Sequence, residues 1–398
     1  MIGPNQRTRD LPGYPLARIP AIKRRLLEAG VDVIDLSAGD SDGFPPEGTR
    51  DALVEALGRE VVHKYGFQQG LPEFRQAIAR WMERRFAQQV DPVTEVLPLI
   101  GSKEGLAHLA FAVVEPGQVV VVPEPGYQAY LGGAVLAGAT PHVVPLRAEQ
   151  GFLLELDTLP ADLLARTALV YVNYPNNPTA AIAPRDYLER LVAACRRHQI
   201  VLAYDNAYAD ITFDGYVAPS ILEIPGAREV AVEFFSMSKS FKMTGWRLGF
   251  AVGNADVIAA LTKVKSYVDT GSFQALQAAA AWTLDHAETV VPPLVAELAR
   301  RRDAAVAALG EIGLVVEAPQ GAMYLWVPLP DGIASADFTG RALEEEGVAL
   351  LPGSAFGAAG EGYFRIALTV GPERLREAVR RLQRALAACR DALATRAG

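Results

Sequence analysis

A single lysine in this chain is surrounded by residue types suited to covalent chemistry. Residues 236–240 read Ser-Met-Ser-Lys-Ser, and Gly245-Trp246-Arg247 follow shortly after. The run comes directly after an apolar stretch at 230–235 that predicts a strand, and α/β sheets bind ligands beyond the carboxyl ends of their strands. An isolated lysine is usually a solvated surface charge. A lysine amine in a polar loop can instead form a Schiff base with a carbonyl compound and then move a proton, which favours a chemical role for Lys239.

This segment resembles the signature of the class I and II aminotransferases, the fold-type-I enzymes that use pyridoxal 5'-phosphate (PLP). The family pattern is Ser-x-Ser-Lys with an arginine eight residues after the lysine, and Lys239 and Arg247 have that spacing. The resemblance extends from about Leu11 to Thr369. It implies a ping-pong transfer of an amino group from an L-amino acid to a 2-oxo acid, with Lys239 as the Schiff-base and proton-shuttle residue.

The phosphate of PLP needs hydrogen-bond donors and positive charge. Arg247 offers a planar guanidinium and Ser236 a hydroxyl. Residues 101–105 follow a predicted strand and open a predicted helix, whose free backbone N–H groups favour an anion. By resemblance, Ser102 and Lys103 lie on the phosphate. Tyr65 matches a tyrosine that family members lend to the phosphate of the neighbouring subunit, which implies a homodimer with shared active sites.

The pyridine ring needs a carboxylate, donors for its phenolic oxygen and a stacking partner. Asp205 ends an apolar strand, and a carboxylate beside the ring nitrogen raises the pKa of that nitrogen. By resemblance, Tyr208 and Asn177 bind the phenolic oxygen and Tyr127 stacks on the ring. Ala180 stands where the family has a glycine, so the local backbone conformation is in question, since glycine often occupies positive φ.

An amino acid substrate needs its carboxylate held in a fixed orientation, which a bidentate arginine does best. Arg365 interrupts an apolar run at 363–367, and in the family this arginine holds the α-carboxylate. Gly39 matches a backbone contact in the family's Gly-x-Gly-Asp-Pro loop, although Ser37 and Ser41 replace the usual glycine and proline.

The side chain of the substrate is less well defined by the sequence. The motifs at 11–15, 101–105 and 269–277 resemble the LL-diaminopimelate-type and alanine-type members, and aspartate is a third candidate, with glutamate and 2-oxoglutarate as the expected partner pair. No arginine precedes Phe273 where some aspartate enzymes bind a distal carboxylate. Arg18 or Lys265 could take that place.

Two other functions use the same residues differently. A PLP-dependent β-eliminating (C–S) lyase would also need Lys239 and Arg365. A non-catalytic regulator of this fold would carry an N-terminal DNA-binding domain, whereas the aminotransferase-like sequence begins near residue 11.

The elements that position these residues alternate between strand and helix, which predicts an α/β fold with a mostly parallel sheet. The resemblance implies a seven-stranded sheet in a large domain at 48–290 and a smaller α+β domain formed by 1–47 and 291–398. In the C-terminal part we expect a long helix at 273–310 interrupted at Pro292-Pro293, strands at 314–317, 323–327 and 363–369, and helices at 336–347 and 372–387. We predict the seven strands at residues 96–100, 119–122, 142–145, 169–172, 200–204, 230–235 and 248–252.

Composition narrows the classes of partner. The formal net charge of −8 argues against a nucleic-acid-binding surface. The two cysteines, Cys195 and Cys389, are too far apart in sequence for a CxxC motif, so neither a disulfide framework nor a cysteine metal site is expected. No apolar run is long enough for a transmembrane helix and the start lacks a signal-peptide pattern, so we expect a cytoplasmic protein.

Overall fold

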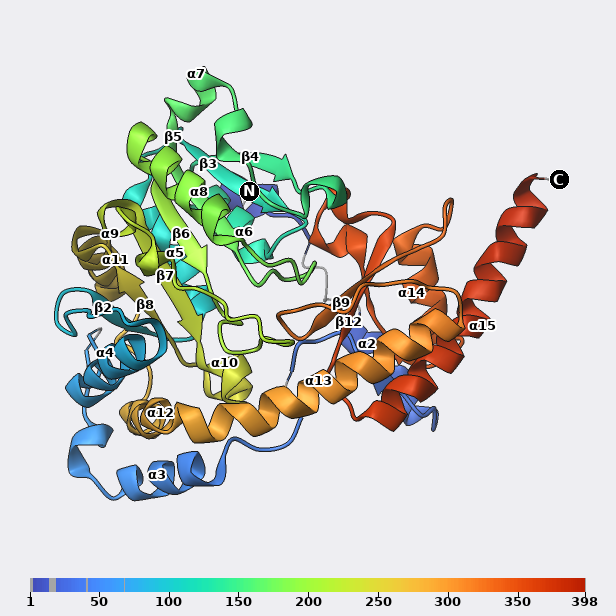
Figure 1. The fold of residues 1–398 in the computed structure, drawn as a ribbon, viewed down its shortest axis with the longest axis horizontal. Helices are drawn as coiled ribbons and strands as arrows, with labels where there is room; N and C mark the ends of the chain where they lie inside the picture. Colours follow the sequence, from blue (N-terminus) through green and yellow to red (C-terminus); the bar gives the residue numbers. More distant parts are fainter. Residues whose placement is uncertain (1–2, 14–18, 41, 68, 398) are drawn as a thin grey trace.

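A seven-stranded sheet forms the centre of the computed structural model, which describes residues 3–13, 19–40, 42–67 and 69–397 (Figure 1). The strand order is β2-β8-β7-β6-β5-β3-β4, with β8 antiparallel to both neighbours and the other pairs parallel. Each of the seven strands predicted for this sheet is present. The bounds are β2 (Val96–Leu99), β3 (Val119–Glu124), β4 (Thr140–Pro145), β5 (Thr167–Asn173), β6 (Val201–Asp205), β7 (Ala231–Ser236) and β8 (Gly249–Gly253).

The central strands are apolar throughout because helices cover both faces of the sheet. Val170 and Val172 of β5 pack into a cluster with one set of helices, whereas Leu169 and Tyr171 pack into another on the opposite face. The first face is covered mainly by α4 (Pro72–Phe86), α8 (Arg185–His198) and α12 (Gln274–Asp285). The second is covered by α5 (Ser102–Val113), α6 (Gln128–Ala137) and α11 (Ala255–Val268).

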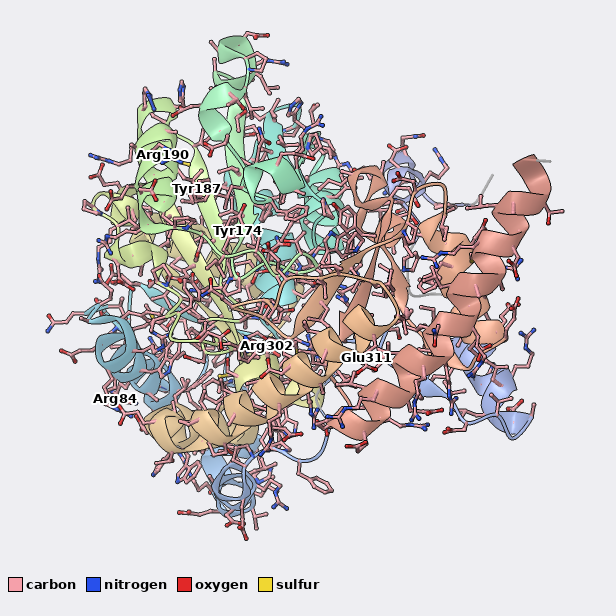
Figure 2. All side chains as sticks on the ribbon, turned by 45° about the vertical axis from the view of Figure 1, so that its right-hand side comes forward. Arg84, Tyr174, Tyr187, Arg190, Arg302 and Glu311 are labelled. Atoms are coloured by element: carbon pink, nitrogen blue, oxygen red, sulfur yellow. The ribbon has the colours of Figure 1, made fainter. Side chains whose placement is uncertain are left out.

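Helix α8 shows how one such element divides its side chains. Tyr187 packs edge-on against Tyr174, with the ring centroids 5.7 Å apart, whereas Arg190 lies on the outer side and pairs with Asp186 (Figure 2). Apolar and aromatic side chains at helical spacing therefore fix the helix on the sheet, and the charged side chains face solvent.

A second unit contains the antiparallel sheet β11-β12-β9 and the parallel pair β1-β10. Its strands are β9 (Tyr324–Pro328), β11 (Leu351–Pro352) and β12 (Tyr363–Ala367), with β1 (Ile34–Asp35) paired to β10 (Val348–Ala349). Its helices are α2 (Ile19–Glu28), α13 (Ala287–Glu311), α14 (Ser335–Glu344) and α15 (Pro372–Ala397). The remaining helices are α1 (Gln6–Asp10), α3 (Glu47–Leu57), α7 (Ala161–Leu164), α9 (Ala227–Val230) and α10 (Met237–Ser240).

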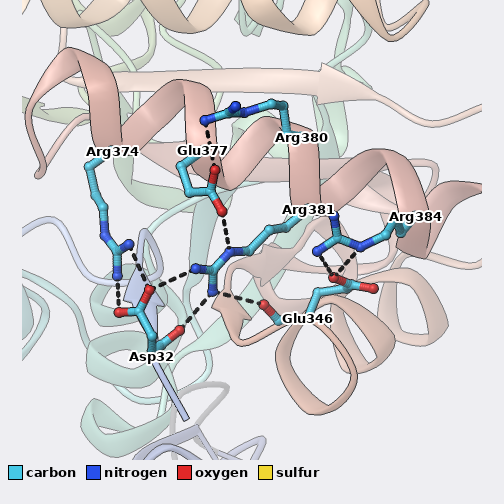
Figure 3. Close-up of polar contacts among 7 residues, drawn as sticks. All are labelled: Asp32, Glu346, Arg374, Glu377, Arg380, Arg381 and Arg384. Carbon is cyan, nitrogen blue, oxygen red and sulfur yellow. Dashed lines mark hydrogen bonds and ion pairs between the residues drawn. The ribbon is translucent and has the colours of Figure 1, made fainter.

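Charged side chains join the two chain ends in this second unit. Asp32, just before β1, accepts hydrogen bonds from Arg374 and Arg381 of α15 (Figure 3). These two guanidinium groups hold the pKa of Asp32 at about 2, below its usual range. Arg381 also pairs with Glu377 one turn earlier on the same helix.

Helix α13 runs from the large sheet to the second unit and packs against a different hydrophobic core at each end (Figure 1). Val290 and Val291 pack against the core of the large sheet, and Leu294 and Val295 pack against the core of the second unit. The division into 48–290 and 1–47 with 291–398 remains a prediction, which this change of cluster supports.

Three local expectations are wrong. Pro292 and Pro293 do not interrupt α13; the break falls at His286 instead. The two prolines cannot donate a hydrogen bond to the carbonyls of Glu288 and Thr289. All four residues are exposed, so water can bind those carbonyls. Residues 314–317 form no strand, because no described strand lies beside them to accept and donate hydrogen bonds. Helix α15 runs ten residues beyond the predicted end, to Ala397.

No helix in the described part of the chain is long and apolar enough to cross a membrane.

Candidate active site

A cavity of about 360 Å³ opens at the carboxyl ends of β5, β6 and β7 and is also lined by residues of the second unit. It contains nearly all of the candidate site residues. Those that line it are Gly39, Ser102, Lys103, Tyr127, Asn177, Asp205, Tyr208, Ser236, Lys239, Arg247 and Arg365. Tyr65 does not line the cavity of its own chain, and its side chain is 77% exposed.

Lys239 lies on a single helical turn that begins where β7 ends. Ser236 is the N-cap, and its hydroxyl accepts a hydrogen bond from the backbone N–H of Ser238 at 3.2 Å. This turn directs Lys239 into the cavity, where its Nζ donates to the carbonyl oxygen of Gly39 from the loop after β1. The lysine amine therefore reaches across from the large sheet to the N-terminal segment.

One end of the cavity gathers positive charge. Lys103 is in the first turn of α5, and burial together with the charge of Arg247 holds its pKa below the usual value. Gly101, the N-cap of α5, has φ of 72°, and a Cβ at this position would lie 2.5 Å from Nη2 of Arg247. The glycine thus lets the guanidinium approach a helix N-terminus, and this end of the cavity suits an anion.

Asp205 ends β6 and presents one carboxylate oxygen without a partner. The hydroxyl of Tyr130 donates to Oδ2 of Asp205 at 2.6 Å. The other oxygen, Oδ1, is buried and has no hydrogen bond within the protein. Burial raises the pKa of this carboxyl to about 6, against the lowering effects of Tyr130 and of the backbone N–H of Ala207. A buried acceptor without a donor is costly, so Oδ1 fits a ligand that carries an N–H group.

The aromatic and amide side chains surround the space between Lys239 and Asp205. The hydroxyls of Tyr208 and Tyr324 lie 2.9 Å apart. Burial raises the pKa of Tyr324, but the charges of Lys239 and Arg365 outweigh it, so the pKa falls below its usual value. The side-chain amide oxygen of Asn177, Oδ1, accepts a hydrogen bond from Arg365 at 2.7 Å, which leaves the NH₂ end of that amide free to donate.

Arg365 on β12 is fully enclosed without an acidic partner. Its Nη1 donates to Asn177, and its Nη2 donates to the carbonyl oxygen of Ser37 at 2.5 Å. Its guanidinium carbon lies 4.2 Å from the ring centre of Tyr324 and 5.0 Å from that of Phe356. No carboxylate among the described residues pairs with it, its Nε has no hydrogen-bond partner, and burial lowers its pKa. A buried guanidinium in this state suits a carboxylate ligand.

Two of the three departures from the family pattern, Ala180 and Ser37, can be assessed in the structure. Ala180 has φ of 60°, the left-handed conformation for which the family glycine is suited. The Ser37 hydroxyl donates to Oδ1 of Asp35 at 2.6 Å, which fixes the loop before Gly39. A Cβ at Gly39 would lie 2.2 Å from the Tyr324 hydroxyl, so the close approach requires glycine. Ser41 lies outside the described residues.

Lys265 is not available for a distal carboxylate, contrary to expectation. It is completely buried and pairs with Glu104 at 3.0 Å and with Asp269 at 2.8 Å. It ties α11 to α5 behind the cavity and does not line it. Arg18, the other residue considered for that role, lies outside the described residues.

Sequence reasoning missed Tyr130 and Tyr324. Tyr130 follows Tyr127 by three residues, a spacing that shows a shared helix face but nothing about Asp205, which is 75 residues away. Tyr324 reads as an ordinary residue of an apolar strand.

The residues present fit PLP. A cationic helix N-terminus suits the phosphate, the unpartnered Oδ1 of Asp205 suits the N–H of the pyridine ring, and the Lys239 amine suits the aldehyde. Among the described residues no group of three or more His, Cys, Asp or Glu side chains could hold a metal ion. Both cysteines are buried and unbridged.

Comparison with known proteins supplies an independent result. The family described as "Aminotransferase class I and II" matches residues 31–382. An LL-diaminopimelate aminotransferase of Syntrophobacter fumaroxidans is 44% identical over 379 residues, which is 95% of this chain and 98% of that protein. One of Aquifex aeolicus is 44% identical, again over 95% of this chain and 98% of that protein. A solved structure of a probable N-succinyldiaminopimelate aminotransferase from Thermus thermophilus superimposes with a TM-score of 0.88 at 38% identity, covering 93% of this chain and 99% of the other.

Proposed function

Because this chain belongs to the class I and II aminotransferases, we propose that LL-diaminopimelate is its amino donor and 2-oxoglutarate the amino acceptor. The observation that carries this choice is the 44% identity, over 95% of the chain, to relatives named for that substrate. The chain is a PLP-dependent aminotransferase, and the specific donor is the proposed part.

Lys239 has two tasks in this proposal. When bound, PLP holds the amino group of the lysine or of the substrate covalently and withdraws the electrons released at the substrate Cα. Lys239 Nζ holds the cofactor until the substrate amine takes its place. The freed amine then removes the proton from Cα and returns it on the cofactor side. One water molecule would supply the carbonyl oxygen of the departing 2-oxo acid while the amino nitrogen stays behind, and the acceptor would take up that nitrogen by the reverse of these steps, which makes the kinetics ping-pong.

The remaining cofactor contacts follow from the charges around the cavity. We propose that Arg247, Lys103, Ser102 and Ser236 bind the phosphate, which the pairing of two cations at a helix N-terminus supports. The orphaned Oδ1 supports a role for Asp205 at the ring nitrogen.

Donors and an aromatic ring complete the cofactor site. We assign Asn177 and Tyr208 to the phenolic oxygen and Tyr127 to the ring face. The Asn177 assignment is supported by the hydrogen bond that its side-chain Oδ1 accepts from Arg365, because this bond leaves the NH₂ group to donate.

Arg365 is the proposed anchor of the substrate α-carboxylate. The guanidinium group is held by hydrogen bonds to Asn177 and Ser37 and by two aromatic rings, so the Arg365 side chain loses little rotational freedom when the substrate binds. Once its carboxylate is fixed, the substrate can bind with the Cα–H bond directed toward Lys239, which is the orientation that proton removal requires. We assign the backbone of Gly39 to the same carboxylate.

We also propose a homodimer in which Tyr65 contacts the phosphate of the partner subunit. Tyr65 and Phe67 stack on each other at 6.4 Å and are 77% and 64% exposed. Exposed apolar side chains are also present on the adjoining segments, since Phe273 contacts His63 and is 45% exposed, and Tyr267 is 88% exposed. Exposed apolar surface of this kind is typical of subunit interfaces.

A donor panel tests the proposed function. Purified PLP-loaded enzyme is supplied with 2-oxoglutarate and LL-diaminopimelate, L-aspartate or L-alanine, and glutamate formation is measured. We expect the highest kcat/KM with LL-diaminopimelate, loss of activity in Lys239→Ala, and normal activity in the exposed control Lys263→Ala. A higher kcat/KM with aspartate or alanine overturns the substrate proposal. Pyruvate and ammonia from a β-substituted donor without any 2-oxo acid would indicate a lyase.

A further inference from the structure

Tyr130 is the only described side chain that hydrogen bonds to the Asp205 carboxylate. Its hydroxyl donates to Oδ2 at 2.6 Å, and both residues are buried. The second oxygen, Oδ1, has no partner, and Asp205 lines the cavity. Oδ2 therefore accepts a hydrogen bond from Tyr130, and Oδ1 remains available to a ligand in the cavity.

The Tyr130 ring is held on two sides. It stacks on Tyr171 with centroids 4.9 Å apart and planes 13° apart, and it meets Tyr127 edge-on at 5.8 Å. The Tyr171 hydroxyl donates to the carbonyl oxygen of Leu106 in α5 at 2.8 Å, so that ring is fixed in turn. Because Tyr130 cannot rotate without breaking this packing, its hydroxyl defines a fixed point for Oδ2.

We propose that Tyr130 is a positioning residue for the cofactor: its hydroxyl fixes Asp205 so that Oδ1 faces the ring nitrogen, and it stabilises the ionised carboxylate. This inference rests on the proposed role of Asp205. Donation to a carboxylate favours its charged form, and only the charged form can pair with a protonated ring nitrogen. The other titratable groups around Asp205 are the phenols of Tyr127, Tyr208 and Tyr324 and, across the cavity, the cations Lys239 and Arg365.

Removal of the hydroxyl takes away the side-chain donor and leaves the buried carboxylate with only the backbone N–H of Ala207. The neutral acid is then favoured, so the pKa of Asp205 rises further above its usual range. At a given pH a smaller fraction of the protein is ready to bind the cofactor. The packing of the ring is unaffected, because phenylalanine retains the surface that stacks on Tyr171.

The test compares Tyr130→Phe with the matched control Tyr171→Phe, which also loses one buried hydroxyl but none on Asp205. The dissociation constant for PLP is measured by equilibrium dialysis between pH 5 and pH 9. We expect the acid limb of the affinity profile of Tyr130→Phe to move upward by about one pH unit, with about tenfold weaker binding at pH 5 and about twofold weaker binding at pH 7. Tyr171→Phe should keep the wild-type profile. An unmoved acid limb in Tyr130→Phe, or the same change in both variants, overturns the inference.

Two further variants separate the possible failures. Asp205→Asn should bind PLP weakly and without the acid limb; binding equal to wild type would refute the role of Asp205 and with it that of Tyr130. Tyr130→His, whose ring N–H can donate to Asp205, should recover part of the affinity that Tyr130→Phe loses. Far-UV circular dichroism of the cofactor-free variants checks that each is folded, and no recovery in a folded Tyr130→His contradicts the hydrogen-bond argument.

Discussion

Glu233 is a buried carboxyl whose burial should weaken the folded state as the pH rises. It lies on β7, is fully buried, and accepts hydrogen bonds from Nδ2 of Asn206 at 2.8 Å and from the Ser220 hydroxyl. Burial raises its pKa from 4.5 to about 8. The folded state therefore binds a proton that the unfolded chain releases, so the contribution of Glu233 to stability is present below pH 4.5 and is lost progressively up to about pH 8.

The size of this effect follows from the two pKa values. At pH 7 the unfolded chain gains about 3 kcal/mol from ionisation that the folded chain does not, and at pH 5 the gain is only about 1 kcal/mol. Glutamine cannot ionise, and its carbonyl can accept from Asn206 while its NH₂ donates to Ser220. We therefore expect Glu233→Gln to be more stable than wild type by about 3 kcal/mol at pH 7. With about 2.1 cal/mol/K per residue over 398 residues, this is a rise in Tm of about 4 °C.

Differential scanning calorimetry of the cofactor-free protein at pH 5 and pH 7 measures this difference. Glu229→Gln, which removes an exposed carboxylate paired with Arg196, is the control and should show no such pH-dependent gain. The reasoning is refuted if the Tm difference between Glu233→Gln and wild type is the same at both pH values, or if Glu233→Gln is less stable at pH 7.

Three further predictions concern the substrate anchor, a strained turn and the chain ends. Arg365→Lys loses the bidentate fork, so KM for the amino donor should rise about 10- to 100-fold with a smaller change in kcat, and an unchanged KM in steady-state assays contradicts this. Ala180→Gly relieves a φ of 60° and should raise stability by up to about 1 kcal/mol, whereas a clear fall in Tm would show that the conformation is unstrained. The pKa of Asp32 is lowered from 3.8 to about 2, so the contribution of Asp32 to folding stability is present above pH 3.8 and is lost as the pH falls through about 2. The Tm deficit of Asp32→Asn should therefore shrink across that range, and a constant deficit argues against the ion pairs.

The sequence predicted the large sheet well because its strands are buried on both faces. Apolar runs such as those at β5 and β6 differ from amphipathic helices by length and by the absence of helical spacing, so their positions could be inferred without tertiary information. The candidate site was predicted mainly from the family resemblance, and several of its residues stand at strand ends or helix starts. Asp205 after β6 and Lys239 after β7 are the clearest cases.

The errors have a common physical cause, which is dependence on distant parts of the chain. Residues 314–317 have strand-like composition, but strand formation needs a neighbouring strand that the fold does not supply. The two prolines of α13 were expected to break it, yet their side of the helix is exposed. Lys265 was considered for substrate binding, but its charge is neutralised by Glu104, a residue 161 positions away in sequence.

A single-turnover experiment tests the central claim most directly. PLP-loaded enzyme is mixed with LL-diaminopimelate in the absence of any 2-oxo acid, and the visible absorbance of the Lys239-bound cofactor is followed. We predict that the band disappears as one amino group per site is transferred to the cofactor and one equivalent of 2-oxo acid is formed, and that it returns when 2-oxoglutarate is added. A band that persists in the presence of LL-diaminopimelate, or that is already present in Lys239→Ala, would contradict the account.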